Sequence, residues 1–170
     1  MRAHFQMFAG YSAWANHRLH AACALLDEAD YKAERGAFFG SIHGALNHLI
    51  VTDRMWLARL RGETLPPHRL NAVIFDDLAT LREARAHEDA DLSAQVATLT
   101  DAQLAGDFRW TRSSDGELVI QPMWAMLAHI FNHQTHHRGQ VHGLLSQAEI
   151  DPPSLDLPVF QKASGLGFSE

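Results

Sequence analysis

Residues 122–148 read PMWAMLAHIFNHQTHHRGQVHGLLSQA. Apolar side chains recur along this stretch at helical spacing: Leu127, Ile130, Phe131, Val141 and Leu144. This spacing places them on one face of an α-helix, where they can pack against a core. Proline suits the first turn of a helix, so we expect the helix to begin at Pro122 and to end near Ala148.

Three earlier segments show the same helical spacing of apolar residues. They are residues 4–27, residues 41–61, and a segment from Asp76 or Asp77 to Leu99. Ser41 can cap the second of these helices, and Gly62 is placed to end it. With four long helices and almost no strand, the sequence predicts an all-α four-helix bundle.

The connections between these helices carry further information. Residues 62 to about 75 include Pro66-Pro67 and are long for a link between neighbouring antiparallel helices, so we expect a crossover along the bundle. Residues 108–121 alternate weakly around Ser114-Asp115-Gly116, which predicts a short hairpin before the last helix. Residues 28–40 show no sustained period, and residues 151–170 form a C-terminal tail.

Composition limits the fold and the class of partner. The chain has 170 residues, of which 46% are hydrophobic, so we expect residues 1–170 to form one domain. A net charge of −6 with 14 lysines and arginines argues against nucleic acid as a partner. No apolar run is long enough for a signal peptide or a membrane span, so we expect a cytoplasmic protein. Because Cys23 is the only cysteine, a thiolate-rich metal site is excluded.

The 12 histidines are the unusual feature of this composition. His129, His133 and His137 lie four residues apart on the last helix, so consecutive members can point to one spot beside it. All three would span about 12 Å, too far for a single ion, so one of them must be left out. His48 lies beside the apolar stripe of the second helix and is a candidate third ligand. The alternative is that these histidines are hydrogen-bonded core residues, and their spacing alone does not decide between the two.

Three segments carry a resemblance to a known family. Residues 132–140, NHQTHHRGQ, resemble the NHxxHHRGQ signature of the DinB/YfiT-like metalloenzymes. Residues 46–62 and 11–16 resemble the second and first helices of that family. The resemblance implies an up-down-down-up bundle with metal ligands at His48, His133 and His137. Under this assignment His136 is not a ligand, and His129 is either structural or an outer neighbour of the site.

Three protein ligands leave a coordination position open, as in catalytic zinc sites. We expect one divalent metal ion, zinc or nickel, in a metal-dependent enzyme that acts on a small molecule. The resemblance points both to transferases that use a low-molecular-weight thiol as co-substrate and to hydrolases, and of the two we expect the transferase. One alternative is a hydrolase that uses metal-activated water, and another is a metal-binding protein without catalysis. The resemblance also suggests a homodimer, with the first helix or the tail at the contact.

Three charged residues are candidates for the pocket. Arg85 and Glu88 interrupt the apolar stripe of the third helix at positions that should face inward, where an unpaired charge is costly. They could serve the site, form a structural ion pair, or indicate that the phase of the helix is set wrongly. Arg138 could hold an anionic group of the substrate, or it could bind helix carbonyls or pair with an acidic residue.

Overall fold

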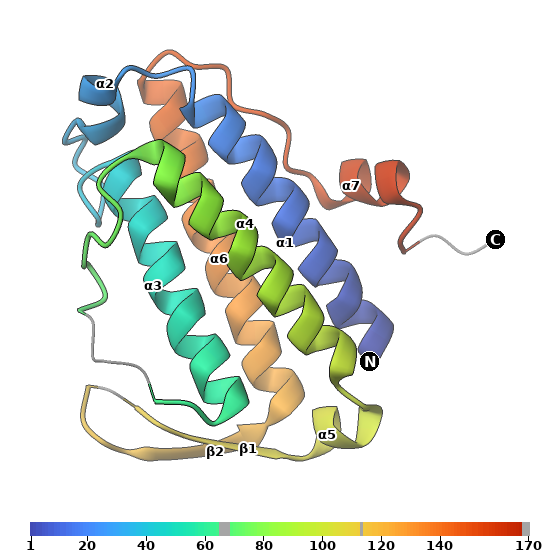
Figure 1. Ribbon diagram of the computed structural model, residues 1–170. Helices are drawn as coiled ribbons and strands as arrows, with labels where there is room; N and C mark the ends of the chain where they lie inside the picture. The colour runs from blue at the N-terminus through green and yellow to red at the C-terminus, as the bar shows by residue number, and fades with distance from the viewer. Residues whose placement is uncertain (65–68, 113, 168–170) are drawn as a thin grey trace.

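The computed structural model describes residues 1–64, 69–112 and 114–167. Four long helices dominate this part of the chain: α1 (Arg2–Cys23), α3 (Ile42–Arg61), α4 (Leu78–Thr98) and α6 (Met123–Gln147). Helices α1 and α3 each pack against both α4 and α6. In Figure 1, α1 and α6 run upward while α3 and α4 run downward. The predicted up-down-down-up four-helix bundle is confirmed.

The boundaries of α3 and α4 follow from local chemistry. The hydroxyl of Ser41 accepts a hydrogen bond of 3.0 Å from the Gly44 N–H at the start of α3. Gly62 ends the same helix with a φ of 69°, a left-handed conformation that glycine adopts without strain. A carboxylate oxygen of Asp77 accepts a hydrogen bond from the Thr80 N–H at the start of α4. These caps lie where the sequence predicted helix ends.

The described residues also contain three short helices that the sequence analysis missed: α2 (Glu28–Lys32), α5 (Asp101–Ala105) and α7 (Leu157–Ser164). Helices α2 and α5 have five residues each, too few for an apolar period to show. Helix α7 lies in the segment described only as a tail. Its Phe160 is buried against Tyr11 of α1, with ring centroids 5.9 Å apart.

Both predicted connections are present. Strands β1 (Asp107–Thr111) and β2 (Leu118–Pro122) form an antiparallel hairpin between α4 and α6. Helix α3 ends at one end of the bundle and α4 begins at the other, so the chain between them runs along the bundle as expected (Figure 1). Pro66 and Pro67, which prompted that expectation, lie outside the described residues. None of the helices in the described part of the chain combines the length and the hydrophobicity that a membrane span requires.

A layer of buried polar side chains separates two apolar clusters in the core. One cluster lies where α1 ends and α3 begins, and it includes Leu19, Leu46, Leu81 and Val141. The other lies toward the hairpin and includes Phe5, Trp56, Leu92 and Leu127. Between them lie the residues that we call the polar layer: Asn16, Asp53, Arg85, Asp89, Gln134 and Arg138. The candidate histidines of α3 and α6 lie beside this layer.

Candidate metal centre

His48 of α3 and His133 and His137 of α6 bring three ring nitrogens together. The Nε2 atom of His133 lies 3.3 Å from that of His48 and 3.1 Å from that of His137. Each of the three residues offers a nitrogen within 4.8 Å of the other two. One turn of α6 separates its two histidines, which brings their rings to the same spot facing α3. We call these three residues the histidine cluster.

The outer nitrogen atoms of two rings are held by oxygen atoms. His48 Nδ1 lies 2.7 Å from the carbonyl oxygen of Leu70, and His137 Nδ1 lies 2.7 Å from Oε1 of Gln140. Because both oxygens can only accept, each Nδ1 carries the proton and donates it. Each Nε2 therefore directs a lone pair into the cluster. Hydrogen-bonded outer nitrogens of this kind are the usual support of metal-binding histidines.

The cluster is electrostatically suited to a cation. Burial, reinforced by the neighbouring histidines, lowers the pKa of His133 to about 3. Burial also lowers the pKa of His48 and of His137, so all three rings are neutral at pH 7. The Nε2 lone pairs of His48 and His137 then face Nε2 of His133, and a metal ion at this point could accept a lone pair from each of the three rings. Two ligand nitrogens on tetrahedral zinc are separated by about 3.4 Å, close to the distances in the cluster.

One side of the cluster is closed by Phe39. Its ring stacks on His48 with centroids 3.8 Å apart and meets His137 edge-on at 5.4 Å. Gly44 permits this approach, because a Cβ atom there would lie 2.1 Å from the backbone oxygen of Phe39. His48 and His137 are buried, whereas His133 is half-buried. A ligand can therefore reach the cluster most easily beside His133.

Two further histidines of α6 lie next to the cluster without joining it. The His129 ring is 5.8 Å from that of His133 and packs edge-on against Trp56. His136 Nε2 lies 3.1 Å from Nε2 of Gln140, the residue that holds His137. The group of candidate metal ligands found in the described residues contains neither of them. Gln140 was missed by the sequence analysis, although it lies three residues after His137 in the quoted motif.

Comparison with known proteins identifies the family to which this chain belongs. The chain matches the model of the DinB family over residues 1–166. The chain belongs to the DinB family. It is also 26% identical over 142 residues to Protein DinB of Bacillus subtilis (strain 168), a match that covers 81% of this chain and 82% of that protein. The resemblance seen in the sequence is thus confirmed.

In this DinB-family chain, Arg85 and Glu88 lie in ion pairs. Arg85 is buried, with Nη1 2.5 Å from a carboxylate oxygen of Asp53 and Nη2 3.0 Å from one of Asp89. Glu88 pairs with Arg54 at 2.5 Å. A structural ion pair was one of the alternatives that the sequence analysis left open for both residues, and it is the one that the structure shows. Among the described residues, neither makes a hydrogen bond or an ion pair with a histidine of the cluster.

Arg138 is also buried in the polar layer. Its Nη1 donates to Oε1 of Gln134 at 2.9 Å and to Oδ1 of Asn16 at 3.3 Å, and its Nη2 donates to Thr135. Gln134 in turn donates from Nε2 to Asp53 at 2.9 Å. The side chain is 1% exposed, so it serves the packing of α6 against α1. Hydrogen bonds thus join the helices immediately behind the histidine cluster.

Proposed function

We propose that this chain binds one divalent metal ion, zinc or nickel, on His48, His133 and His137, and that it is a small-thiol-dependent S-transferase. The observation that carries the metal site is the convergence of three Nε2 atoms, two of them on rings whose Nδ1 atoms are held by oxygen. Three protein ligands leave a position for an external ligand. When bound, the metal would hold a low-molecular-weight thiol as its thiolate, which is the nucleophile of the transfer.

The chain's own nucleophiles support an external thiol. Cys23 is fully buried, and burial raises the pKa of its thiol to about 12. The three ligand histidines would bind the metal through Nε2, and His48 and His137 are also held by oxygen atoms through Nδ1. The chain therefore contributes binding and orientation, and the attacking atom comes from a small molecule. Water in place of a thiol would make the enzyme a hydrolase.

The ligand assignment is tested by single substitutions. His48→Ala, His133→Ala and His137→Ala should each abolish stoichiometric metal binding, because two imidazoles hold a divalent ion far more weakly than three. His129→Ala and His136→Ala are the matched controls and should retain it. Metal content of the purified, untagged variants gives the result. Loss of metal in His129→Ala with retention in His137→Ala would move the ligand pair one turn along α6 and refute the assignment.

The reaction is tested with cobalt-substituted protein. A thiol that enters the coordination sphere should produce an intense thiolate-to-cobalt charge-transfer band, which water and carboxylates do not give. Turnover of electrophilic acceptors should then saturate with thiol concentration and require all three histidines. Ester or amide hydrolysis that switches on near neutral pH without thiol would favour the hydrolase instead. If neither reaction occurs, metal binding without catalysis is the function that remains.

A further inference from the structure

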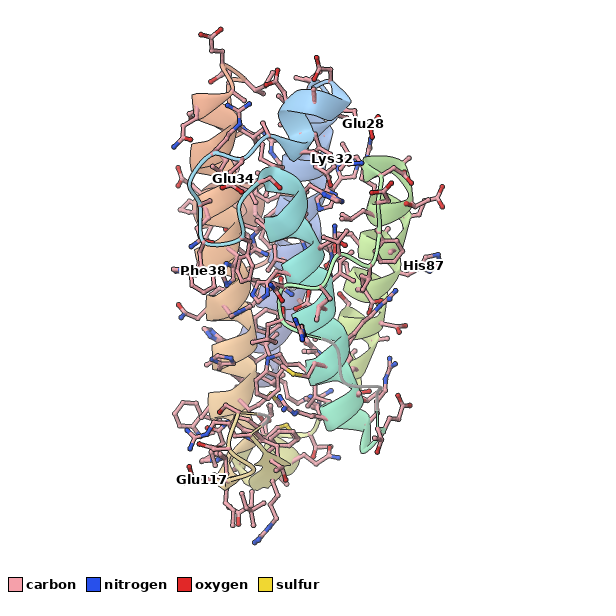
Figure 2. The ribbon with its side chains drawn as sticks, turned by 90° about the vertical axis from the view of Figure 1, so that its left-hand side faces the viewer. Glu28, Lys32, Glu34, Phe38, His87 and Glu117 are labelled. Carbon is pink, nitrogen blue, oxygen red and sulfur yellow. The ribbon has the colours of Figure 1, made fainter. Side chains whose placement is uncertain are left out.

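A groove of about 670 Å³ lies between α1 and α4. Small-molecule sites have volumes of about 300–1,000 Å³, so the groove is large enough for a ligand. Helices α1 and α4 pack on one side of the bundle, whereas the histidine cluster lies between α3 and α6 on the other. Figure 2, which looks onto α3, shows α1 on the far side of the bundle. The groove is therefore separate from the proposed metal centre.

Buried polar side chains form the bottom of the groove. Asn16 of α1 donates to Asp89 of α4 at 2.9 Å, and the buried Arg85 is paired with Asp89 and Asp53. His20, one turn after Asn16 on α1, also lines the groove and is 4% exposed. Its Nδ1 atom has no hydrogen-bond partner among the described residues. Because buried polar atoms are rarely left unpaired, His20 offers a hydrogen bond to a ligand.

The two ends of the groove differ in character. Helices α1 and α4 are antiparallel (Figure 1), and the hydrogen bond from α1 to Asp89 fixes their register. One turn from that bond toward the end of α1, the groove is lined by His20 and Arg82. In the opposite direction it is lined by Ala13 and Ala90. The seven residues from Ala13 to His20 span about 10 Å along the helix, so the groove has a polar end and, about 10 Å away, an end with small apolar side chains.

Arg82 gives the polar end a positive charge that the protein does not balance. Among the described residues it makes no hydrogen bond and no ion pair, although it lines the groove. It precedes Asp89 by seven residues, nearly two helical turns, and therefore lies on the same side of α4 as that buried carboxylate. Glu83 also lines the groove without an ion pair, but it is turned about 100° farther from the core and lies at the outer edge.

We propose that the groove between α1 and α4 binds a small carboxylate that carries an apolar chain. The carboxylate accepts hydrogen bonds from the guanidinium of Arg82 and the imidazole of His20, and the chain lies along the small side chains toward Ala13 and Ala90. A guanidinium can donate two parallel hydrogen bonds to one carboxylate, which gives this end its preference. Burial of the chain supplies the rest of the binding free energy. An alcohol lacks the charge, and an ammonium group would meet Arg82 with a like charge.

Calorimetric titration of the full-length protein with linear carboxylates, from butanoate to decanoate, tests the proposal. Each added carbon should strengthen binding by about two- to fourfold until the chain spans the groove, after which further carbons should add little. Hexanoate should bind about tenfold more tightly than hexanol, and hexylammonium should bind more weakly than either. His133→Ala should give the same values, because the groove does not include the histidine cluster.

Two pairs of variants locate the binding site. Arg82→Gln should weaken hexanoate binding by about tenfold and leave hexanol binding unchanged, whereas Glu83→Gln, which removes the neighbouring charge at the outer edge, should not weaken it. Ala86→Trp places a large side chain in the middle of the groove and should abolish binding at every chain length. Ala94→Trp, at an exposed position of α4 outside the groove, is its control and should bind normally.

Several outcomes would overturn the proposal. Equal affinity for hexanoate and hexanol would remove the role of Arg82, and undiminished hexanoate binding in Arg82→Gln or in a folded Ala86→Trp would place the ligand elsewhere. Loss of binding in His133→Ala would place the carboxylate at the histidine cluster. If no linear carboxylate binds, and sedimentation shows a dimer that Ala86→Trp disrupts, the groove is covered by a second copy of the chain instead.

Discussion

Gln140 holds His137 in the orientation that a metal ligand needs. Its Oε1 accepts from His137 Nδ1, and its Nε2 contacts His136, so one amide lies between two imidazoles. Leu70 does the same for His48 with a backbone carbonyl. The residue types differ, but the physical effect is shared, because an acceptor at Nδ1 leaves the Nε2 lone pair free for the ion.

Removal of this support should weaken metal binding without abolishing it. Gln140→Ala leaves all three ligands in place but frees the His137 ring to rotate and to change tautomer. Loss of such an outer partner typically costs about 10- to 100-fold in metal affinity. Competition with a chromophoric chelator measures the change. Gln147→Ala, an exposed glutamine on the same helix, is the control, and an equal loss there would show that the effect is not specific to His137.

His20, a buried histidine of α1 outside the histidine cluster, should make the free energy of unfolding depend on pH in the acid range. His20 is 4% exposed, and burial, together with nearby Arg85 and Arg82, lowers its pKa to about 3. In the unfolded chain His20 takes up a proton near pH 6.5, whereas in the folded protein it does so only near pH 3. The folded state therefore has its full stability above pH 6.5 and loses part of it as the pH falls from 6.5 toward 3. Between pH 7 and pH 5 this one group should cost about 2 kcal/mol of unfolding free energy.

Urea denaturation at several pH values tests this. The difference in unfolding free energy between the unchanged protein and His20→Gln should shift by that amount between pH 7 and pH 5, because glutamine does not titrate. His17→Gln, at an exposed position on the same helix, controls for the loss of an imidazole. A constant difference across this pH range would mean that His20 is not held neutral.

At the scale of the elements, the polar layer joins the helices to one another. Arg85 of α4 reaches Asp53 of α3, and Gln134 of α6 donates to the same carboxylate. Asn16 of α1 donates to Asp89 of α4 at 2.9 Å. Buried charges of this kind contribute little net stability when paired but are costly when one partner is removed. The layer therefore enforces one mutual arrangement of α3 and α6, on which the histidine cluster depends.

Arg85→Met should be strongly destabilising. It leaves two buried carboxylates, Asp53 and Asp89, without their cation, for which a cost of about 3–5 kcal/mol is typical. The loss should shrink at lower pH, because burial raises the pKa of Asp89 and its protonation removes one of the two unpaired charges. Urea unfolding at pH 7 and pH 5 provides the measurement. Arg82→Met, at an exposed site of α4, should change stability by less than about 0.5 kcal/mol, and a similar loss there would contradict the assignment.

The long helices and their order could be predicted because their signals are local and repeated. Apolar spacing, the cap at Ser41 and the stop at Gly62 all act within a few residues of each helix end. The four-residue spacing of His129, His133 and His137 is a local signal too, but it left open which two of them pair, and the choice of His133 and His137 came from the family resemblance. Helix α7 could not be predicted in this way, because its Phe160 is buried by contact with Tyr11, a residue far away in the sequence. Leu70 was equally hidden, since a backbone carbonyl leaves no mark in the sequence.

Among the described residues, two large apolar clusters hold the bundle together on either side of the histidine cluster, and a smaller one packs α7 on α1. Each of the four long helices contributes apolar residues to both clusters. The core is therefore held together by side chains alone and does not require a metal ion. This differs from small zinc domains, in which metal binding supplies the folding free energy. A metal ion bound at the histidine cluster would therefore add stability to a structure that already exists.

Removal of the metal should leave the fold intact and lower its melting temperature. Chelation should not change the helical circular dichroism at 25 °C, because both apolar clusters and the polar layer persist. Free metal at 100 times its dissociation constant would add about 2.7 kcal/mol, which for a domain of this size corresponds to about 5–10 °C in melting temperature. His133→Ala should melt at one temperature with or without metal. Collapse of the helical signal on chelation would instead make the ion part of the folding core, and an unchanged melting temperature would argue that the cluster binds no metal at all.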